Sequence, residues 1–309
     1  MMRHRTLIHC PGTLRARGFT LVEAVIVIIL TAIVSAGVAV FLRAPVAGYV
    51  DAAARADLAD TADTALRRMA RDIRLALPNS VRLSPDGGGG YYIEFLLTRT
   101  GGRYLSTDDS YTSGNPLSFR DQDQTTANWP FDVVGPISTS LEQQIQPNSD
   151  SLVVYNLGQA PADAYQSTLS NTNRTLITAV STNASTGVTT ITLQKNVYAY
   201  QLDTQKSPSP SYRFQVISGP VTYHCDPVNQ NVTRYWNYTI SATQPTSAAT
   251  MVSGSNALIA TGVTGCLFTY TQASMNSALV VLNIQATTPG NTRGGTVGLF
   301  QQVHVDNTP

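Results

Sequence analysis

Glu23 is the residue whose position most needs a chemical explanation. It stands directly before residues 24–42, a run without a single charged side chain. As a helix rising ~1.5 Å per residue, this run spans roughly 28 Å, which is close to the hydrocarbon core of a bilayer. A carboxylate deep in a membrane costs ~2.5 to 3.5 kcal/mol on insertion scales and usually has a partner. The sequence therefore predicts a membrane segment in which Glu23 has a partner.

Other residue groups that could do chemistry give weaker signals. His224, Cys225 and Asp226 could form a metal or nucleophilic site, but neighbours on a strand alternate between faces and cannot converge. The acidic stretches "TDDS" (107–110) and "RDQDQ" (120–124) offer oxygen ligands for Ca²⁺ without EF-hand spacing, so solvated loops are the alternative interpretation. The chain has no G-x-S-x-G, H-E-x-x-H or phosphate-binding loop motif. We predict no catalytic residue, metal or cofactor, and no enzyme activity.

The basic residues are unevenly distributed. The formal net charge is only +1, which gives no reason to expect a nucleic-acid partner. Four arginines nevertheless precede Gly18, where there is no acidic residue, and the rest of the chain has an excess of acidic side chains. By the positive-inside rule, this asymmetry predicts a cytoplasmic N-terminus and an exported remainder, with Arg43 too weak a signal to reverse it.

A cleaved secretory signal peptide is the alternative interpretation of this segment. It has a basic start, an apolar centre and "VSA" at 34–36 as a small-residue cleavage site, which would leave a mature terminus near Gly37. The carboxylate of Glu23 inside the apolar part argues against it, as does the helical pattern that continues after Leu42. The alternative function would be that of an exported binding or adhesive protein.

The stretch "RGFTLVEAVIVIIL" resembles the N-terminal signature of type IV pilins and of type II secretion pseudopilins. The resemblance implies that residues 1–18 are a prepilin leader, which a prepilin peptidase removes by cutting between Gly18 and Phe19. It also implies N-methylation of Phe19. Glu23 would then be an assembly residue that pairs with the new α-amine of Phe19 on its own or a neighbouring subunit, because a paired buried charge costs less and fixes the register between helices.

The resemblance and the apolar pattern together predict a helical spine at residues 19–77. About 19–42 would cross the membrane, and Leu58, Ala62, Ala65, Met69, Ile73 and Leu77 would form an apolar stripe on the rest. Pro45 predicts a kink and Pro78 the end of the helix. The fold class is α+β: a long N-terminal helix, transmembrane in one half and amphipathic in the other, packed on a mainly antiparallel β head in a pilin-like arrangement.

Residues 78–309 are predicted to form the β-rich periplasmic head. Val, Ile, Thr and Tyr are concentrated in runs separated by Gly, Pro, Asn and Ser. The predicted strands are 91–98, 151–157, 174–180, 188–194, 212–217, 221–225, 232–240, 266–271, 278–287 and 298–305. Ser218-Gly219-Pro220 and Gly187 predict two hairpin turns. We expect residues 100–150 to be an elaborated loop region and not a second core.

The neck and the carboxyl half allow a narrower comparison. "ADLADTADTALRRMARDIRLALPNSVRL", "RYWNY" and "TGVTGCLFTY" resemble the J-type minor pseudopilins, and within them the MshO-type proteins of mannose-sensitive haemagglutinin (MSHA) pilus biogenesis. This implies a minor subunit in the inner membrane that primes or caps a filament tip. Its partners would be other minor and major pilins and the inner-membrane assembly platform. A J-type pseudopilin of a type II secretion system is the alternative within the class, and a membrane-anchored hydrolase is a distant one.

Three cysteines add evidence on compartment. Cys10 lies in the predicted leader, which leaves Cys225 and Cys266 in the exported part. An even pair in an exported domain is most simply a disulfide. Closing a loop of ~40 residues would stabilise the head by roughly 3 to 4 kcal/mol in the chain-entropy model.

Overall fold

A computed structural model describes residues 18–110, 113–124, 127–201, 206–274, 276–287 and 295–309. The chain divides into two compact units, Met1–Ala53 and Ala54–Pro309. The predicted leader therefore lies outside the described residues except for Gly18, and so does Cys10. The second unit begins inside the helical region and includes the neck.

A single long helix, α1 (Leu21–Arg74), accounts for the N-terminal region. Pro45 lies inside it, and the helix continues through that position; the kink that we expect there stays a prediction. The helix ends three residues before Leu77, the predicted last residue. The reason is tertiary: the amide of Leu77 donates to the carbonyl of Leu96, and the carbonyl of Leu75 accepts from Thr98, so the backbone joins a strand before Pro78 can stop the helix.

Twelve strands are found among the described residues, arranged in two antiparallel sheets. The large sheet contains β1 (Arg82–Pro85), β2 (Tyr91–Tyr104), β3 (Trp129–Val134), β4 (Ser151–Val153), β5 (Arg174–Thr182), β6 (Thr189–Leu193), β7 (Arg213–Asp226), β8 (Asn231–Trp236) and β9 (Ser255–Thr261). The small sheet contains β10 (Val263–Ser274), β11 (Ser277–Thr287) and β12 (Thr296–Asp306). Short 3₁₀ turns occur at Asp121–Asp123, Val197–Tyr200 and Ala248–Met251.

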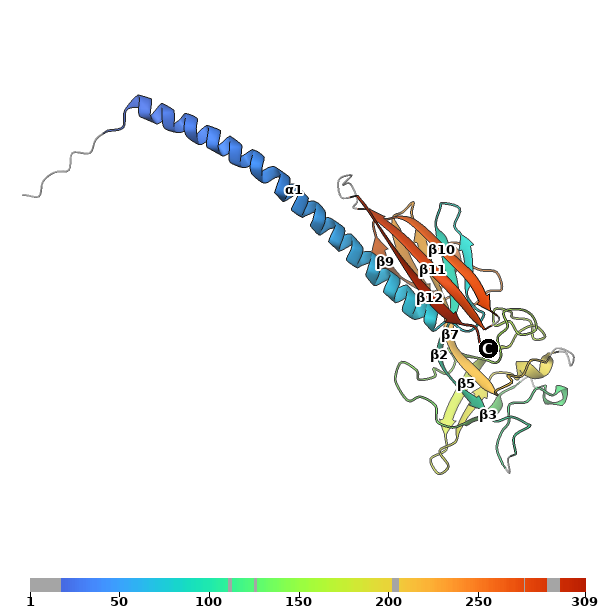
Figure 1. Cartoon of the computed structure of the whole chain (residues 1–309). Coiled ribbons are helices and arrows are strands. Elements are labelled where there is room, and N and C mark those ends of the chain that lie inside the picture. The colour runs from blue at the N-terminus through green and yellow to red at the C-terminus, as the bar shows by residue number, and fades with distance from the viewer. Residues whose placement is uncertain (1–17, 111–112, 125–126, 202–205, 275, 288–294) are drawn as a thin grey trace, which may run out of the picture. The chain divides into compact units, whose positions relative to one another are not determined.

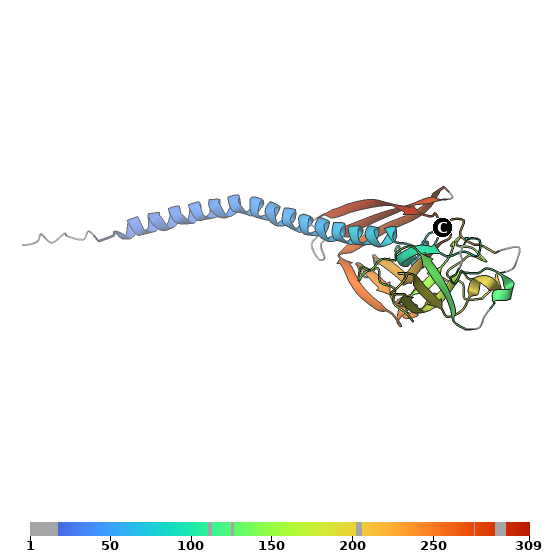
Figure 2. The same ribbon diagram turned by 90° about the horizontal axis from the view of Figure 1, so that it is seen from below.

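The last turns of α1 pack between the two sheets. Ala65, Met69 and Ile73 are fully buried and share one apolar core with residues of β2, β7 and β8 on the large sheet and of β10, β11 and β12 on the small one. Figure 1 and Figure 2 both show this end of α1 alongside β11 and β12. The stripe predicted from sequence is buried as expected, apart from Leu58, which is only half-buried. The small residues Ala62, Ala65 and Ala70 let the helix backbone approach both sheets.

The large sheet closes on itself. Its strand order is β1-β2-β3-β6-β5-β4-β7-β8-β9, and β2 also pairs with β7. Strands β2, β3, β6, β5, β4 and β7 therefore form a closed ring of six. Tyr104, Phe131, Leu152, Ile191 and Phe214 fill a second apolar core that belongs to this ring. A closed ring of this kind leaves no unpaired strand edge.

Strands β2 and β7 belong to both cores. Tyr91–Leu97 pair with Gly219–Cys225 in the part that covers α1, whereas residues 98–103 pair with 213–217 in the ring. The register shifts between the two parts, at Leu97/Thr98 and Thr98/Thr100. A bulge inserts an extra residue and bends the strand. One strand can therefore contribute side chains to two cores that lie in different directions.

Two sequence predictions are wrong in this region. The hairpin expected at Ser218-Gly219-Pro220 does not exist, because β7 runs unbroken through these residues and they form part of the bulge opposite Leu97. Residues 100–150 are not merely a loop region: they supply the end of β2, the strand β3, and the buried side chains Leu117 and Ile145 of the second core. The hairpin at Gly187 is confirmed, since β5 and β6 pair around it and Gly187 has a φ of 70°. The predicted fold class is also confirmed: a long apolar N-terminal helix packs on antiparallel sheets.

Candidate assembly site

The backbone before α1 is exposed and not helical. Gly18, Phe19 and Thr20 precede the first helical residue, and 78% of Phe19 is exposed. A Cβ added at Gly18 would meet no atom within 4 Å. Folding therefore does not require glycine at this position.

Thr20 and Glu23 together form the start of α1. The amide of Glu23 donates to the hydroxyl of Thr20 at 3.3 Å, and the amide of Ala24 donates to the carbonyl of Thr20 at 3.1 Å. Thr-x-x-Glu is the capping-box pattern, in which the residue at the third helical position also places a negative charge near the positive end of the helix dipole. We did not predict the cap at Thr20 from the sequence, although its pattern is visible in "TLVE".

The apolar part of α1 has no cover within the described chain. An apolar stretch of 18 residues in the helix is exposed along its whole length. Among the described helices, α1 alone is long and apolar enough to cross a membrane. Burying a single Leu, Ile or Phe side chain contributes about 1.5 to 3 kcal/mol, so a handful of them equals the ~5 to 15 kcal/mol that stabilises a whole domain. By length and composition, this part of α1 is therefore suited to lipid or to contact with other apolar helices.

The triplet His224-Cys225-Asp226 is held in three separate structural contacts. Cys225 on β7 forms a disulfide with Cys266 on β10, as the sequence predicts, with the two Cα atoms 6.5 Å apart. The His224 ring stacks on Tyr92 and lies 3.2 Å from the carboxylate of Asp86. Asp226 accepts from Asn229 in the turn that follows β7. The three side chains do not converge on one site, as the alternation of faces along a strand predicts.

The acidic loop residues bind other parts of the chain. Asp109 lies 2.6 Å from Arg103, Asp121 lies 2.5 Å from Lys206, and Asp123 accepts from Ser118. Within the described residues, no group of three or more His, Cys, Asp or Glu side chains is placed to hold a metal ion.

Two buried clusters of charged side chains link neighbouring elements: one joins α1 to β7 and β8, and the other joins β1 to β2. Asp72 near the end of α1 lies 2.9 Å from Arg234 on β8 and accepts from the hydroxyl of Tyr223 at 2.8 Å. On the neighbouring strands, Arg82 binds Glu94 at 2.6 Å.

The hydroxyl of Tyr238 also donates to Glu94, at 3.0 Å. Burial raises the pKa of Glu94, although Arg82 and Tyr238 oppose the shift.

Comparison with known proteins identifies one motif. Residues 13–39 match the family model described as the prokaryotic N-terminal methylation motif. No curated protein and no solved structure matches the chain. The motif implies processing by a prepilin peptidase in the context of pilus assembly, and with the apolar helix it indicates an inner-membrane-anchored prepilin. In this N-terminal segment the chain is therefore similar to type IV pilin-like proteins, which are generally structural subunits.

Proposed function

We propose that this protein is a minor pilin that helps to begin or cap a type IV pilus of the MSHA type. In this proposal a prepilin peptidase removes residues 1–18 on the cytoplasmic side and Phe19 is N-methylated. The apolar part of α1 then leaves the membrane for the filament core, where Glu23 pairs with the α-amine of Phe19 on its own or a neighbouring subunit. The observation that carries the proposal is the uncovered apolar helix directly after an exposed Gly18–Phe19 bond.

The elaborate head supports a position at the tip. The second unit contains a closed six-stranded ring in addition to the strands that cover α1. Such a head is too bulky to repeat along a close-packed shaft, and a tip subunit has no neighbour above it. The heads of this and other minor pilins would then form the complex from which the major pilin polymerises at the inner-membrane assembly platform.

The first experiment is N-terminal sequencing and intact mass measurement of the mature protein from cells with and without a prepilin peptidase. We expect a terminus at methylated Phe19 only in cells that contain the peptidase. A terminus near Gly37 in both strains would instead show a secretion signal and would refute the proposal. Gold labelling of an epitope tag after Pro309 tests the position, and labels spaced along the shaft would contradict a tip role.

A further inference from the structure

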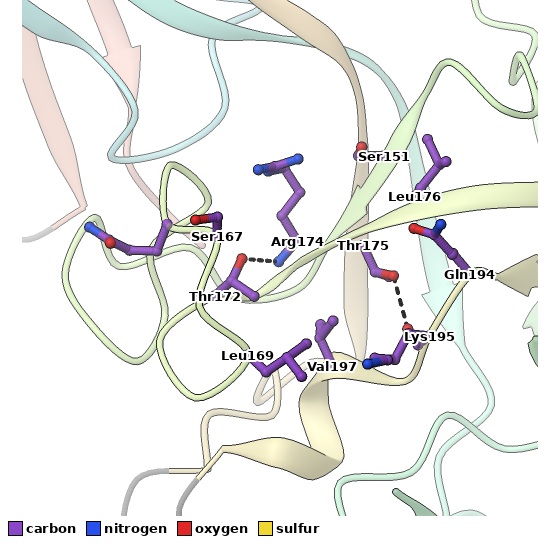
Figure 3. A pocket seen from close by; sticks show the side chains of 11 residues that line it. Ser151, Ser167, Leu169, Thr172, Arg174, Thr175, Leu176, Gln194, Lys195 and Val197 are labelled. Atoms are coloured by element: carbon purple, nitrogen blue, oxygen red, sulfur yellow. Dashed lines mark hydrogen bonds between the residues drawn. The ribbon is translucent and has the colours of Figure 1, made fainter. Parts of the chain in front are cut away.

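A cleft on the outer side of the six-stranded ring has the composition of an anion-binding site. It measures about 540 Å³ and is lined by residues of β4 and β5, by the residues that follow β6, and by the loop before β5. Arg174 and Lys195 are among the eleven lining residues drawn in Figure 3, and none of the eleven is acidic. The charged side chains that line the cleft are therefore both cationic.

Arg174 is a partly buried cation without a matching anion. Its Nε donates to the carbonyl of Ala164 at 2.7 Å. Among the described residues its two terminal amino groups have no hydrogen-bond partner, and its guanidinium makes no ion pair. Figure 3 shows the side chain reaching from β5 into the space between the Ser167 loop and Ser151. Two donors thus point into the cleft in the planar arrangement that binds a carboxylate through two parallel bonds.

The surroundings of Arg174 make its charge costly in the empty cleft. Burial lowers the pKa of Arg174, and the nearby carboxylate of Asp163 only partly offsets this. Asp163 is already occupied, because it accepts from the amide of Tyr165 and from the side chain of Gln166. An anionic ligand would supply the missing counter-charge.

The rest of the cleft offers mixed hydrogen-bonding groups. Ser167 and Gln194 are exposed and have no side-chain hydrogen bond among the described residues. The hydroxyl of Thr175 donates to the backbone carbonyl of Lys195. The ammonium group of Lys195 lies over the ring of Tyr200, 5.3 Å from the ring centroid. Hydroxyl and carboxamide groups both donate and accept, so they match the hydroxyls of a sugar.

The cleft continues past Arg174. A second hollow of about 340 Å³ shares Ser151, Arg174 and Leu176 with the first and extends to Ser218 and Asn237. Arg174 therefore stands between two adjoining hollows. A ligand longer than one sugar ring could occupy both while its acidic group remains at the guanidinium.

We propose that this cleft binds an acidic saccharide, with the carboxylate held by Arg174 and the sugar hydroxyls by the polar side chains around it. Lys195 attracts the anion and contributes less than Arg174, because its ammonium group is a point charge on a flexible stem. The proposal concerns the head alone and does not depend on where the subunit sits in a filament.

The test is calorimetric titration of the full chain in detergent micelles with glucuronate, glucose, acetate and inorganic phosphate as separate probes. We expect saturable binding of glucuronate, and weaker binding of the other three. Arg174→Gln should weaken glucuronate binding by more than about tenfold, since a hydrogen bond to a charged group is lost. Lys195→Gln should weaken it by a few-fold, and it keeps the test valid if Arg174→Gln fails to fold. Arg213→Gln is the matched control, because Arg213 is an exposed cation outside both hollows.

Each other outcome overturns a defined part of the proposal. Glucose that binds as tightly as glucuronate would remove the role of the carboxylate. Acetate or phosphate that binds as tightly would show an anion site without sugar contacts. No binding of glucuronate at millimolar concentration, or an equal loss in Arg213→Gln, would refute the site altogether.

Discussion

Glu23 takes part in a helix cap and in the pairing that we propose, and a single substitution can separate the two. Its backbone completes the helix cap with Thr20, and its position after the Gly18–Phe19 bond suits the pairing with an α-amine that we propose. Glutamine can occupy the same place in a capping box but has no charge. The charge and the cap can therefore be tested independently.

Glu23→Gln should leave leader cleavage intact and reduce incorporation into filaments severalfold. The physical reason is that an uncharged side chain cannot pair with the α-amine that cleavage produces. Quantitative immunoblots of membrane and sheared-filament fractions measure both effects. Glu142→Gln, which changes an exposed head carboxylate, is the control, and a wild-type filament level in Glu23→Gln would contradict the assembly role.

Asp72 anchors the neck to the head, and its loss should be costly. Its side chain is 10% exposed and Arg234 is 11% exposed, so Asp72→Ala leaves a nearly buried guanidinium without its anion. We expect the free energy of unfolding to fall by about 3 kcal/mol. Asp63→Ala on the same helix is the matched control: its partner Arg67 is 74% exposed, and surface pairs contribute about 0.2 to 1 kcal/mol. Equal losses in denaturant titrations of the two variants would refute the anchoring role.

Glu94 should give the head a measurable pH dependence. Its pKa is raised by burial in the folded state, so the stability that it contributes is fully present below its ordinary pKa of 4.5 and is lost as pH rises through the raised value. The wild type should therefore lose stability relative to Glu94→Gln as pH rises from 4.5. Parallel denaturant titrations from pH 4.5 to 8 measure this difference. A difference that stays constant or changes in the opposite sense would contradict the raised pKa.

Some of these residues lie close together in the sequence, whereas others are brought together only by the fold. Gly18, Phe19 and Glu23 lie within six residues of one another, so their arrangement is a local property that a motif can reveal. Asp72 and Arg234 are separated by 162 positions, and their contact exists only because α1 packs under β8. No local pattern distinguishes Asp72 from an exposed helix carboxylate such as Asp63.

At the scale of elements, the paired bulge in β2 and β7 is the feature that sequence analysis misread. Ser-Gly-Pro is typical of a tight turn, and the same residue types also suit a bulge, because both require unusual backbone angles. The choice between them depends on what lies opposite, which here is Leu97 of a strand about 120 residues earlier in the chain. The Gly187 turn was predictable because its two strands are adjacent in sequence.

Gly219→Ala tests this bulge directly. Gly219 has a φ of 132°, a region that residues with a side chain rarely adopt, although a Cβ there would meet no atom within 4 Å. The cost should therefore come from the backbone alone, at about 1 to 2 kcal/mol of unfolding free energy. Gly298→Ala on β12 is the control, since that position has equal space and no positive φ. Thermal unfolding of both variants should show a lower midpoint for Gly219→Ala only.

At the scale of the whole molecule, the neck of α1 is part of the head. The fold class could be predicted from the change between helical and strand periodicity, but the burial of the neck between two sheets could not. Helical periodicity shows that residues 58–73 have an apolar face, yet it does not show that two sheets bury this face. The second core escaped prediction because its buried side chains come from short segments separated by polar loops.

Two truncated chains should therefore behave differently. A chain of residues 54–309 should fold and remain soluble, because it retains Ala65, Met69 and Ile73 in the core. A chain of residues 78–309 lacks the whole neck, which opens the space between the two sheets. It should aggregate or show no cooperative unfolding transition by circular dichroism. Cooperative unfolding of the shorter chain at the same temperature would refute the account of the core.

The way in which β2 and β7 run through both cores bears on how such a head can change in evolution. The chain enters the six-stranded ring along β2 and returns along β7, its antiparallel neighbour. Residues 98–217 therefore form one long connection between the parts of β2 and β7 that cover α1. Lengthening a connection adds little entropic cost to closing it. We therefore expect changes of length within the ring to be tolerated where they spare the contacts that Asn156 and Tyr165 make with Pro78 and Ser80.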